Sequence, residues 1–294
     1  MERTVYALGF FDGVHLGHQA LLCRTRELAR EIGAKAGVLT FDAHPDALVL
    51  GQTPRLLYTT ETRARLLQQA GMERICSLVF DRALMDTPWE DFLHSMITRF
   101  GAAGLVCGAD FRFGRGGEGT ATLLQKACDR ENLVCAVIPP QTLDGTVISS
   151  TYIRTLVEAG DMETASRALG RIYTLSGTVV HGQHLGRTWG IPTANLALPG
   201  SSVCPRKGVY ACKASFDGME TLAVTNIGTR PTVNGDGLTV EAWLPDFSGD
   251  LYGKTLTLSL YHHLRDEKKF ASCADLQAEI RKNAAQTRKL LENT

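Results

Sequence analysis

The sequence lacks long hydrophobic runs and any excess of one charge. No apolar segment approaches the roughly 20 residues that cross a bilayer, and the start, Met1-Glu2-Arg3-Thr4, does not open the positive-then-apolar pattern of a signal peptide. The 31 basic and 31 acidic residues balance, with no block of like charge. We therefore expect no bulk attraction to nucleic acid or to a membrane surface.

The sequence also lacks the Cys-x-x-Cys spacing, since no two of its eight cysteines lie three positions apart. That spacing would indicate a zinc site or a redox motif. Cys76, Cys107, Cys135 and Cys212 lie instead in apolar, strand-like runs, which is typical of buried free thiols in a reducing compartment. The sequence thus predicts a cytoplasmic protein. Its 294 residues suit two domains, which we place at residues 1–168 and 169–294.

The first half of the chain alternates strand-like and helix-like patterns. Near-continuous apolar strands between helices predict an α/β fold with a parallel sheet covered on both faces. Ligands bind such sheets beyond the carboxyl ends of the strands. The predicted strands are Val5–Leu8, Gly37–Phe41, Ile75–Phe80, Gly104–Cys107 and Val134–Ile138, and the predicted helices are residues 18–32, 61–70, 88–100 and 120–131.

From about residue 172, glycines and turn signals multiply. Short alternating segments such as residues 256–260 are typical of half-buried antiparallel strands. Many short strands followed by one helix predict a small antiparallel β-barrel with a C-terminal helix. The predicted strands are residues 173–181, 208–216, 221–227, 238–244 and 255–262, and the predicted helix is residues 272–292.

The most informative segment is Gly9-Phe-Phe-Asp-Gly-Val-His-Leu-Gly-His18, the first signature, which joins the first strand to the first helix. Its glycines let the backbone turn sharply and approach a ligand closely. The unpaired N–H groups at the start of a helix suit a phosphate. His15 and His18, three residues apart, face the same place. The alternative is a glycine-rich turn with two solvated histidines.

The first signature resembles the His-x-Gly-His motif of nucleotidyltransferases, in the form found in bacterial bifunctional riboflavin kinase/FAD synthetases. The resemblance implies a Rossmann-like nucleotidyltransferase domain, in which His15, His18 and Arg154 stabilise charge on the transferring phosphate. Residue 10 is often Asn in the family, and here it is Phe. The segment 148–154 resembles the second phosphate-binding loop, although Ser150 could also be an ordinary helix cap. The implied ATP-binding residues are Gly9, Phe10, Asp12, His15, His18, Ser149, Ser150, Thr151 and Arg154.

Two further segments of the first half match the family and are assigned to the flavin. Residues 40–45 resemble its Phe-x-x-His-Pro, and residues 108–114 resemble its Gly-x-Asp-Phe-x-Phe-Gly. Core packing is the alternative for the two phenylalanines of the second segment. The implied flavin-binding residues here are Phe41, His44, Pro45, Asp110, Phe111 and Phe113.

A second signature, Gly177–Asn195, resembles the riboflavin kinase motif Gly-Arg-x-x-Gly-x-Pro-Thr-Ala-Asn. Flexible glycines let a loop close over phosphates. Thr193 and Asn195 offer neutral oxygens, so they are the candidate ligands of Mg²⁺. The ATP-binding residues implied for the kinase are Gly182, Gly186, Arg187, Gly190, Pro192, Thr193 and Asn195.

Glu241 is the candidate general base of the kinase. It lies in a predicted strand, and the resemblance assigns it the proton of the ribityl hydroxyl. The family often has His two positions later, where this chain has Trp243. Arg230 and Arg265 are the remaining flavin-binding candidates, although Arg265 could instead form a surface ion pair with Asp266 or Glu267.

Three weaker patterns are set aside. Residues 114–119 fit Gly-x-Gly-x-x-Gly but follow the fourth strand rather than the first, which argues against dinucleotide binding. Residues 253–255 resemble the end of a P-loop, but the required glycine at position 248 is Ser. His181, His184, His262 and His263 have no cysteine or carboxylate spacing that completes a zinc site.

The resemblance runs from Ala7 to the last helix and implies two reactions. Riboflavin and ATP give FMN and ADP in the second domain. FMN and a second ATP give FAD and pyrophosphate in the first. One alternative is a transferase of another substrate, such as a cytidylyltransferase, fused to a barrel. Another is a flavin sensor without activity, although His15, His18, Thr193 and Glu241 are all present.

Overall fold

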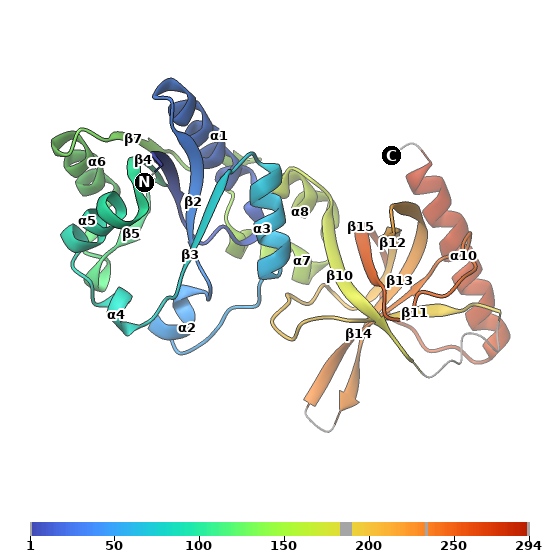
Figure 1. Ribbon diagram of the computed structural model, residues 1–294. Helices are drawn as coiled ribbons and strands as arrows, with labels where there is room; N and C mark the ends of the chain where they lie inside the picture. The colour runs from blue at the N-terminus through green and yellow to red at the C-terminus, as the bar shows by residue number, and fades with distance from the viewer. Residues whose placement is uncertain (1, 183–189, 233–234, 293–294) are drawn as a thin grey trace. The chain divides into compact units, whose positions relative to one another are not determined.

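The computed structural model describes residues 2–182, 190–232 and 235–292, with the backbone alone for 230–232 and 235–237. Contacts within the chain divide it into two compact units, Met1–Ser150 and Thr151–Thr294. The domain boundary between residues 168 and 169 stays a prediction. Figure 1 labels the elements of both units.

The first unit is built on a five-stranded parallel sheet in the order β3-β2-β1-β4-β7, which the sequence alone did not give. Its strands are β1 (Thr4–Leu8), β2 (Lys35–Phe41), β3 (Arg74–Leu78), β4 (Ala102–Gly108) and β7 (Val134–Ile138). The helices around it are α1 (Leu16–Glu31), α2 (Pro45–Val49), α3 (Thr60–Gln69), α4 (Arg82–Met85), α5 (Trp89–Phe100) and α6 (Ala121–Arg130). Two hairpins, β5–β6 (Arg112–Phe113, Gly119–Thr120) and β8–β9 (Thr142–Leu143, Thr146–Val147), and the 3₁₀ turns η1 (Asp12–Val14) and η2 (Arg115–Gly117) complete it.

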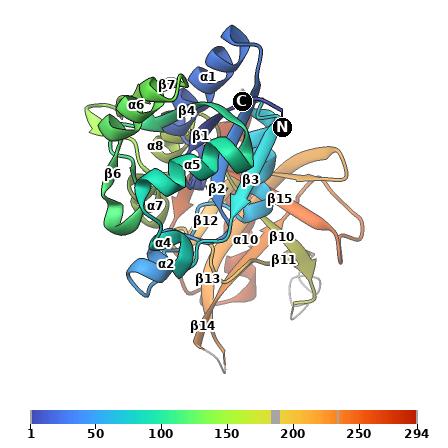
Figure 2. The same ribbon diagram turned by 60° about the vertical axis from the view of Figure 1, so that its left-hand side comes forward.

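Apolar side chains pack on both faces of this sheet. Successive side chains of each strand point to opposite faces, so neighbouring residues of one strand belong to different clusters. Val5 and Ala7 pack with α1 and α3 in one apolar cluster. Tyr6 and Leu8 pack with α5 and α6 in the other, on the side where Figure 2 shows α5. This arrangement explains why the strands have near-continuous apolar sequences, and it confirms the predicted parallel sheet.

Polar residues fix where the helices begin. Each capping side chain accepts a hydrogen bond from the backbone N–H three residues later, which satisfies a donor that the helix cannot pair. The caps formed in this way are Thr59 for α3, Asp81 for α4, Thr120 for α6, Asp161 for α8 (Met162–Leu169) and Ser272 for α10 (Cys273–Leu291).

The second unit contains a closed antiparallel barrel in the order β10-β11-β14-β13-β12-β15. Its strands are β10 (Tyr173–Val180), β11 (Thr193–Ala197), β12 (Gly208–Phe216), β13 (Met219–Thr232), β14 (Gly235–Trp243) and β15 (Thr255–Arg265). Helix α7 (Ser150–Ala159) leads into α8, which contacts β10 and β15, and α10 packs on β12 and β13. Glu163 of α8 pairs with His262 of β15. The predicted barrel with a C-terminal helix is confirmed.

Several elements differ from the prediction, such as the unpredicted helices α2, α4 and α8, and two strands of the barrel differ most. The sequence did not indicate β11, because its residues belong to the second signature and lack alternation. Strand β13 extends to Thr232, past the predicted end at residue 227, because its pairing with β14 continues to Thr232 and Gly235. A proline within a segment, here Pro231, normally argues against predicting a strand there.

Candidate functional site

The first signature forms a tight turn at the carboxyl end of β1. Phe11 adopts a left-handed backbone conformation with φ 60°, and Val14 has φ 42°. Positive φ is unfavourable for a β-branched residue such as Val14, so the surrounding contacts hold this turn in place. Gly9 donates its N–H to Leu39, and Thr40 donates its hydroxyl to Phe10, at 3.2 and 3.0 Å. The turn is therefore fixed to the neighbouring strand β2.

His15 and His18 lie together at the start of α1. Their rings stack with centroids 3.6 Å apart. His15 is the N-cap, and its Nδ1 accepts from the backbone N–H of His18 at 3.3 Å. A Cβ at Gly17 would lie 3.1 Å from the His15 ring, so this position has little room for a side chain. The structure thus brings the two predicted catalytic histidines to one place at a helix N-terminus, which favours an anion.

Asp12 has a structural contact that the sequence did not reveal. Its carboxylate is buried and accepts from the N–H groups of Leu57 and Tyr58, at distances from 3.0 to 3.4 Å. A charge-assisted bond of this kind is stronger than a neutral one. Asp12 therefore ties the signature turn to the segment that precedes α3.

Ser150 contacts the same turn. Its hydroxyl donates to the carbonyl of Asp12 at 2.8 Å, so the segment predicted as a second phosphate-binding loop is joined to the first signature. Ser149 is half-buried beside it. Thr151 and Arg154 follow on α7, where Nη1 of Arg154 donates to Oγ1 of Thr151 at 3.4 Å. Ser150 is the first residue of α7, so the cap position before that helix belongs to Ser149 rather than to Ser150.

The first flavin segment, Phe41 to Pro45, lies at the carboxyl end of β2. His44 caps α2, with its Nδ1 accepting from Asp46 at 3.2 Å, and Pro45 is the first residue of that helix. The Phe10 ring meets His44 edge-on, with centroids 4.6 Å apart. Phe41 packs edge-on against Phe80. Phe10, which the sequence placed on the ATP side, thus contacts a flavin-side residue.

Arg63 was missed by the sequence analysis. It is 3% exposed, and its Nη2 donates to the Phe41 carbonyl at 2.8 Å. Its guanidinium lies 4.1 Å from the centroid of the Phe10 ring. Burial lowers the pKa of Arg63, and the charges of Asp12 and Asp42 oppose this shift. A buried arginine is uncommon without a partner of opposite charge. This burial is the signal that distinguishes Arg63, and it is known only from the structure.

The second flavin segment divides into core and surface residues. Phe113 is buried and packs against Phe92 and Trp89. Phe111 stacks on Phe113 and is half-buried at the edge of the same cluster. The core-packing alternative therefore describes Phe113. Asp110 is exposed. Its contact with the flavin stays a prediction.

The kinase candidates meet on three neighbouring strands of the barrel. Glu241 of β14 stands opposite Asn195 of β11 and opposite Asn226 of β13. Directly opposed side chains have Cβ atoms about 4.5–5.5 Å apart. Glu241 is half-buried between the fully buried Val240 and Ala242, so it points to the other face of the strand. Asn226 was not among the predicted site residues.

Thr193 and Asn195 lie two residues apart on β11, so their side chains share one face. Thr193 pairs with Trp243, two residues beyond Glu241. A Cβ on Gly182 would collide with the Asn195 amide, so a side chain at 182 would displace that amide from its present position. Two neutral oxygens on one face of a strand suit Mg²⁺, which is usually held by few protein oxygens.

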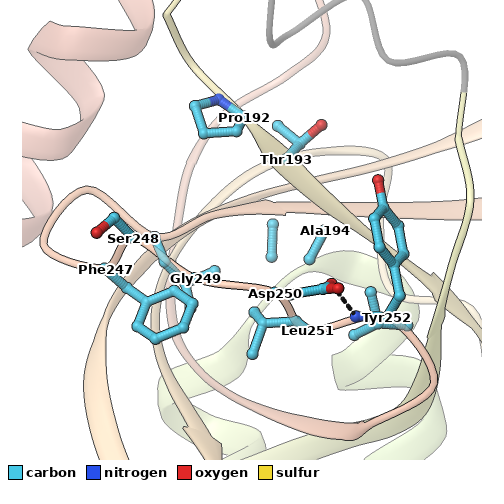
Figure 3. Close-up of a pocket in the computed structure, with 12 residues that line it drawn as sticks. Pro192, Thr193, Ala194, Phe247, Ser248, Gly249, Asp250, Leu251 and Tyr252 are labelled. Carbon is cyan, nitrogen blue, oxygen red and sulfur yellow. Dashed lines mark hydrogen bonds between the residues drawn. The ribbon is translucent and has the colours of Figure 1, made fainter.

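A pocket of about 330 Å³ opens beside the same strand (Figure 3). Pro192 and Thr193 lie on one side of it, across from the segment 247–252. Asp250 holds that segment by accepting from the Tyr252 N–H at 2.9 Å, and Tyr252 stacks on His181 with centroids 4.0 Å apart. The other lining residues are Val179, Ala194, Ala242, Leu244, Phe247, Ser248, Gly249 and Leu251.

Arg265 binds the terminal helix. Its Nε donates to Asn283 at 3.2 Å and lies 3.4 Å from the Glu279 carboxylate. Burial lowers the pKa of Arg265, and Glu279 opposes the shift. The structure thus gives the ion pair to Glu279 rather than to the side chains of Asp266 or Glu267. Of the other predicted residues, Gly190 is exposed with φ +70°, while Gly186, Arg187 and the Arg230 side chain lie outside the described residues.

Taken together, the two units indicate a class of two-site nucleotide-dependent transferase, with one candidate site on a parallel sheet and another on a closed barrel. A family model described as FAD synthetase matches residues 1–152, and one described as riboflavin kinase matches residues 169–291.

Similar proteins agree across almost the whole chain. The bifunctional riboflavin kinase/FMN adenylyltransferase of Pseudomonas fluorescens is 37% identical, covering 97% of this chain and 92% of that protein. The Bacillus subtilis protein of the same name is 34% identical, covering 99% and 93%. A crystal structure from Streptococcus pneumoniae, described as a macrolide-efflux protein, has a TM-score of 0.91 at 30% identity and covers 98% and 94%.

The chain belongs to the family of bifunctional riboflavin kinase/FMN adenylyltransferases. The predicted family, fold class and enzyme function are therefore confirmed. Within the described residues, no helix has the length and hydropathy needed to cross a bilayer.

Proposed function

We propose that this chain makes flavin cofactors in two steps at two separate sites, with the residue roles given below. Riboflavin and ATP give FMN and ADP in the barrel unit. FMN and a second ATP give FAD and pyrophosphate in the parallel-sheet unit. The observation that supports the proposal is that His15 and His18 of the first signature stack in the first unit, while Asn195 of the second signature stands opposite Glu241 in the second.

In the kinase, Glu241 takes the proton of the ribityl 5′-hydroxyl as that oxygen attacks the γ-phosphate. Phosphoryl transfer depends mainly on positioning and charge neutralisation. ATP occupies the 330 Å³ pocket, with its base among apolar side chains such as Leu244 and Leu251. Its phosphates extend toward Thr193 and Asn195, whose amide lies against the backbone of Gly182.

Thr193 and Asn195 would hold Mg²⁺ in this site through the hydroxyl and the amide oxygen. The ion supplies charge neutralisation for the phosphates of ATP. The two side chains share one face of β11, next to Glu241 on β14, so the ligand oxygens and the base are on the same surface.

In the adenylyltransferase, the phosphate of FMN attacks the α-phosphate of ATP, and the bond from the α-phosphate to the leaving pyrophosphate breaks. His15, His18, Arg154 and the N-terminus of α1 stabilise the charge on the transferring phosphate and on pyrophosphate. The chemistry needs no protein nucleophile. Asp12 and Ser150 hold the turn in shape through their contacts with Leu57, Tyr58 and each other.

We place the enzyme in the cytoplasm. Cys107, Cys128 and Cys212 are buried free thiols, as is typical of a reducing compartment.

The test is to incubate the purified protein with riboflavin, ATP and Mg²⁺ and to resolve the three flavins by chromatography over time. We expect FMN to rise and then to give way to FAD. FMN without FAD would contradict the adenylyltransferase assignment. No turnover together with tight flavin binding would indicate a flavin sensor instead.

A further inference from the structure

We infer that Arg63 is a positioning residue of the adenylyltransferase site, which holds the Phe10 ring as an apolar contact for the flavin of FMN. This inference rests on the proposed function of the first unit. It concerns a residue outside both signatures and moves Phe10 from the ATP side of the site to the flavin side.

The first observation is where Arg63 lies. It is on the first turns of α3 and is 3% exposed. Burying a guanidinium costs free energy unless its donors and its charge are compensated. Among the described residues, no carboxylate lies within the 4.0 Å of an ion pair to Arg63. Its guanidinium donates to the Phe41 carbonyl and lies over the face of the Phe10 ring, and the charges of Asp12 and Asp42 act on it from farther away.

The second observation is what these contacts hold together. Arg63 joins α3 to the last residue of β2 and to the first signature at once. The guanidinium lies 4.1 Å from the Phe10 centroid, within the range of a cation–π interaction, which strengthens when the cation is desolvated. The Phe10 ring meets His44 edge-on at 4.6 Å. Arg63, Phe10 and His44 thus form a continuous row of contacts, which we call the Arg63 row.

The third observation is the direction of the Arg63 row. It leads from α3 to the carboxyl end of β2, where Phe41 and His44 are the flavin candidates. The His15–His18 pair lies farther along the signature, beyond the left-handed Phe11. Phe10 is half-buried rather than fully buried, so part of the residue stays accessible, and an aromatic side chain is the kind of group on which an isoalloxazine packs. Disturbing Arg63 should therefore affect FMN more than ATP.

The test measures FAD formation from FMN and ATP, with each substrate varied in turn. Arg63→Met keeps an unbranched apolar stem but removes the guanidinium, its charge and its donor to Phe41. We expect it to raise KM for FMN about tenfold and to change KM for ATP and kcat less than about twofold. Arg63→Lys keeps the charge but not the planar guanidinium, so its KM for FMN should lie between those of the wild type and Arg63→Met. Arg65→Met, on the exposed side of the same helix, is the matched control.

A double-mutant cycle decides whether Arg63 acts through Phe10. Phe10→Leu removes the ring and leaves the hydrogen bond to Phe41, and we expect it also to raise KM for FMN. In Phe10→Leu/Arg63→Met the two effects should overlap rather than multiply. If they multiply, or if KM for ATP rises as much as KM for FMN, the inference is wrong.

A failure of the proposed function can be told apart from a failure of the inference about Arg63. A wild-type protein that forms no FAD contradicts the proposed function, whereas the Arg63 comparison uses a wild type that does. If Arg63→Met fails to fold, Phe10→Leu alone decides, because an unchanged KM for FMN in that variant overturns the inference. Riboflavin kinase activity of each variant, carried by the other unit, shows that the chain is otherwise intact.

Discussion

Glu241 and Asn195 are direct cross-strand partners in the barrel. Asn226 occupies the same position on the other side of Glu241, so the carboxylate stands between two neutral amides. The family motif contains Asn195, but the pairing that sets it beside Glu241 comes from residues 46 positions apart in the sequence. The kinase predictions depend on this pairing.

Glu241→Gln should abolish riboflavin phosphorylation and spare the conversion of FMN to FAD. The amide keeps the shape of the side chain but cannot take the proton, and a general base contributes about 10²–10⁴-fold to the rate. The measurement is kcat for each half-reaction, followed separately. An equal loss of both activities in a folded protein would contradict the two-site assignment.

His18→Ala should have the reverse effect. FAD formation should fall by about 10²–10³-fold, the typical cost of removing one charge-stabilising donor, while FMN formation continues. His18 is preferable to His15, because His15 caps α1 and its loss would also remove that hydrogen bond. Thermal unfolding of His18→Ala should match the wild type. A change in kinase rate as large as the change in FAD formation would count against separate sites.

Gly182→Ala should impair the kinase alone. A Cβ at residue 182 would collide with the Asn195 side chain, so the amide and the Thr193 surface beside it must shift. We expect kcat for riboflavin to fall about tenfold or more, since small misplacements in a phosphoryl-transfer site are costly. Gly200→Ala is the matched control, because a Cβ there meets nothing within 4 Å. Equal kinetics in the two variants would refute the crowding argument.

Cys212 should make the protein less stable at alkaline pH. Burial raises the pKa of its thiol to about 12, from 9.0. Between these values the folded chain keeps a proton that the unfolded chain loses. Unfolding therefore releases a proton, and the free energy of unfolding falls as pH rises, by about 1 kcal/mol from pH 9 to pH 10.

Urea unfolding at pH 8, 9 and 10 tests this. Cys212→Ala should remove that part of the slope, whatever it does to the stability at pH 8. Cys273→Ala is the control, because this thiol is exposed in the folded protein. A slope unchanged by Cys212→Ala would show that other groups carry the alkaline loss.

The regular elements of the first unit were predictable because their cause is local. Helix starts at Thr59 and Thr120 and the apolar strands follow from side-chain type and spacing. Strand β11 was missed because it is stabilised by pairing with β10 and β14 rather than by its own pattern. Phe113 and Arg63 show the same limit at the site. An aromatic in a motif and an arginine in a helix look like ligand and surface residues until their burial is known.

The sequence by itself determined the two classes of fold, the family and most of the candidate residues, because signatures and periodicity are written in consecutive positions. Tertiary structure decided the strand order, the hydrogen bonds from Leu57 and Tyr58 to Asp12, and the place of Glu241 between two asparagines. Each of these joins segments whose proximity depends on packing and backbone geometry. Hydrogen-bond partners across strands and the burial of a charge exist only once the chain has folded.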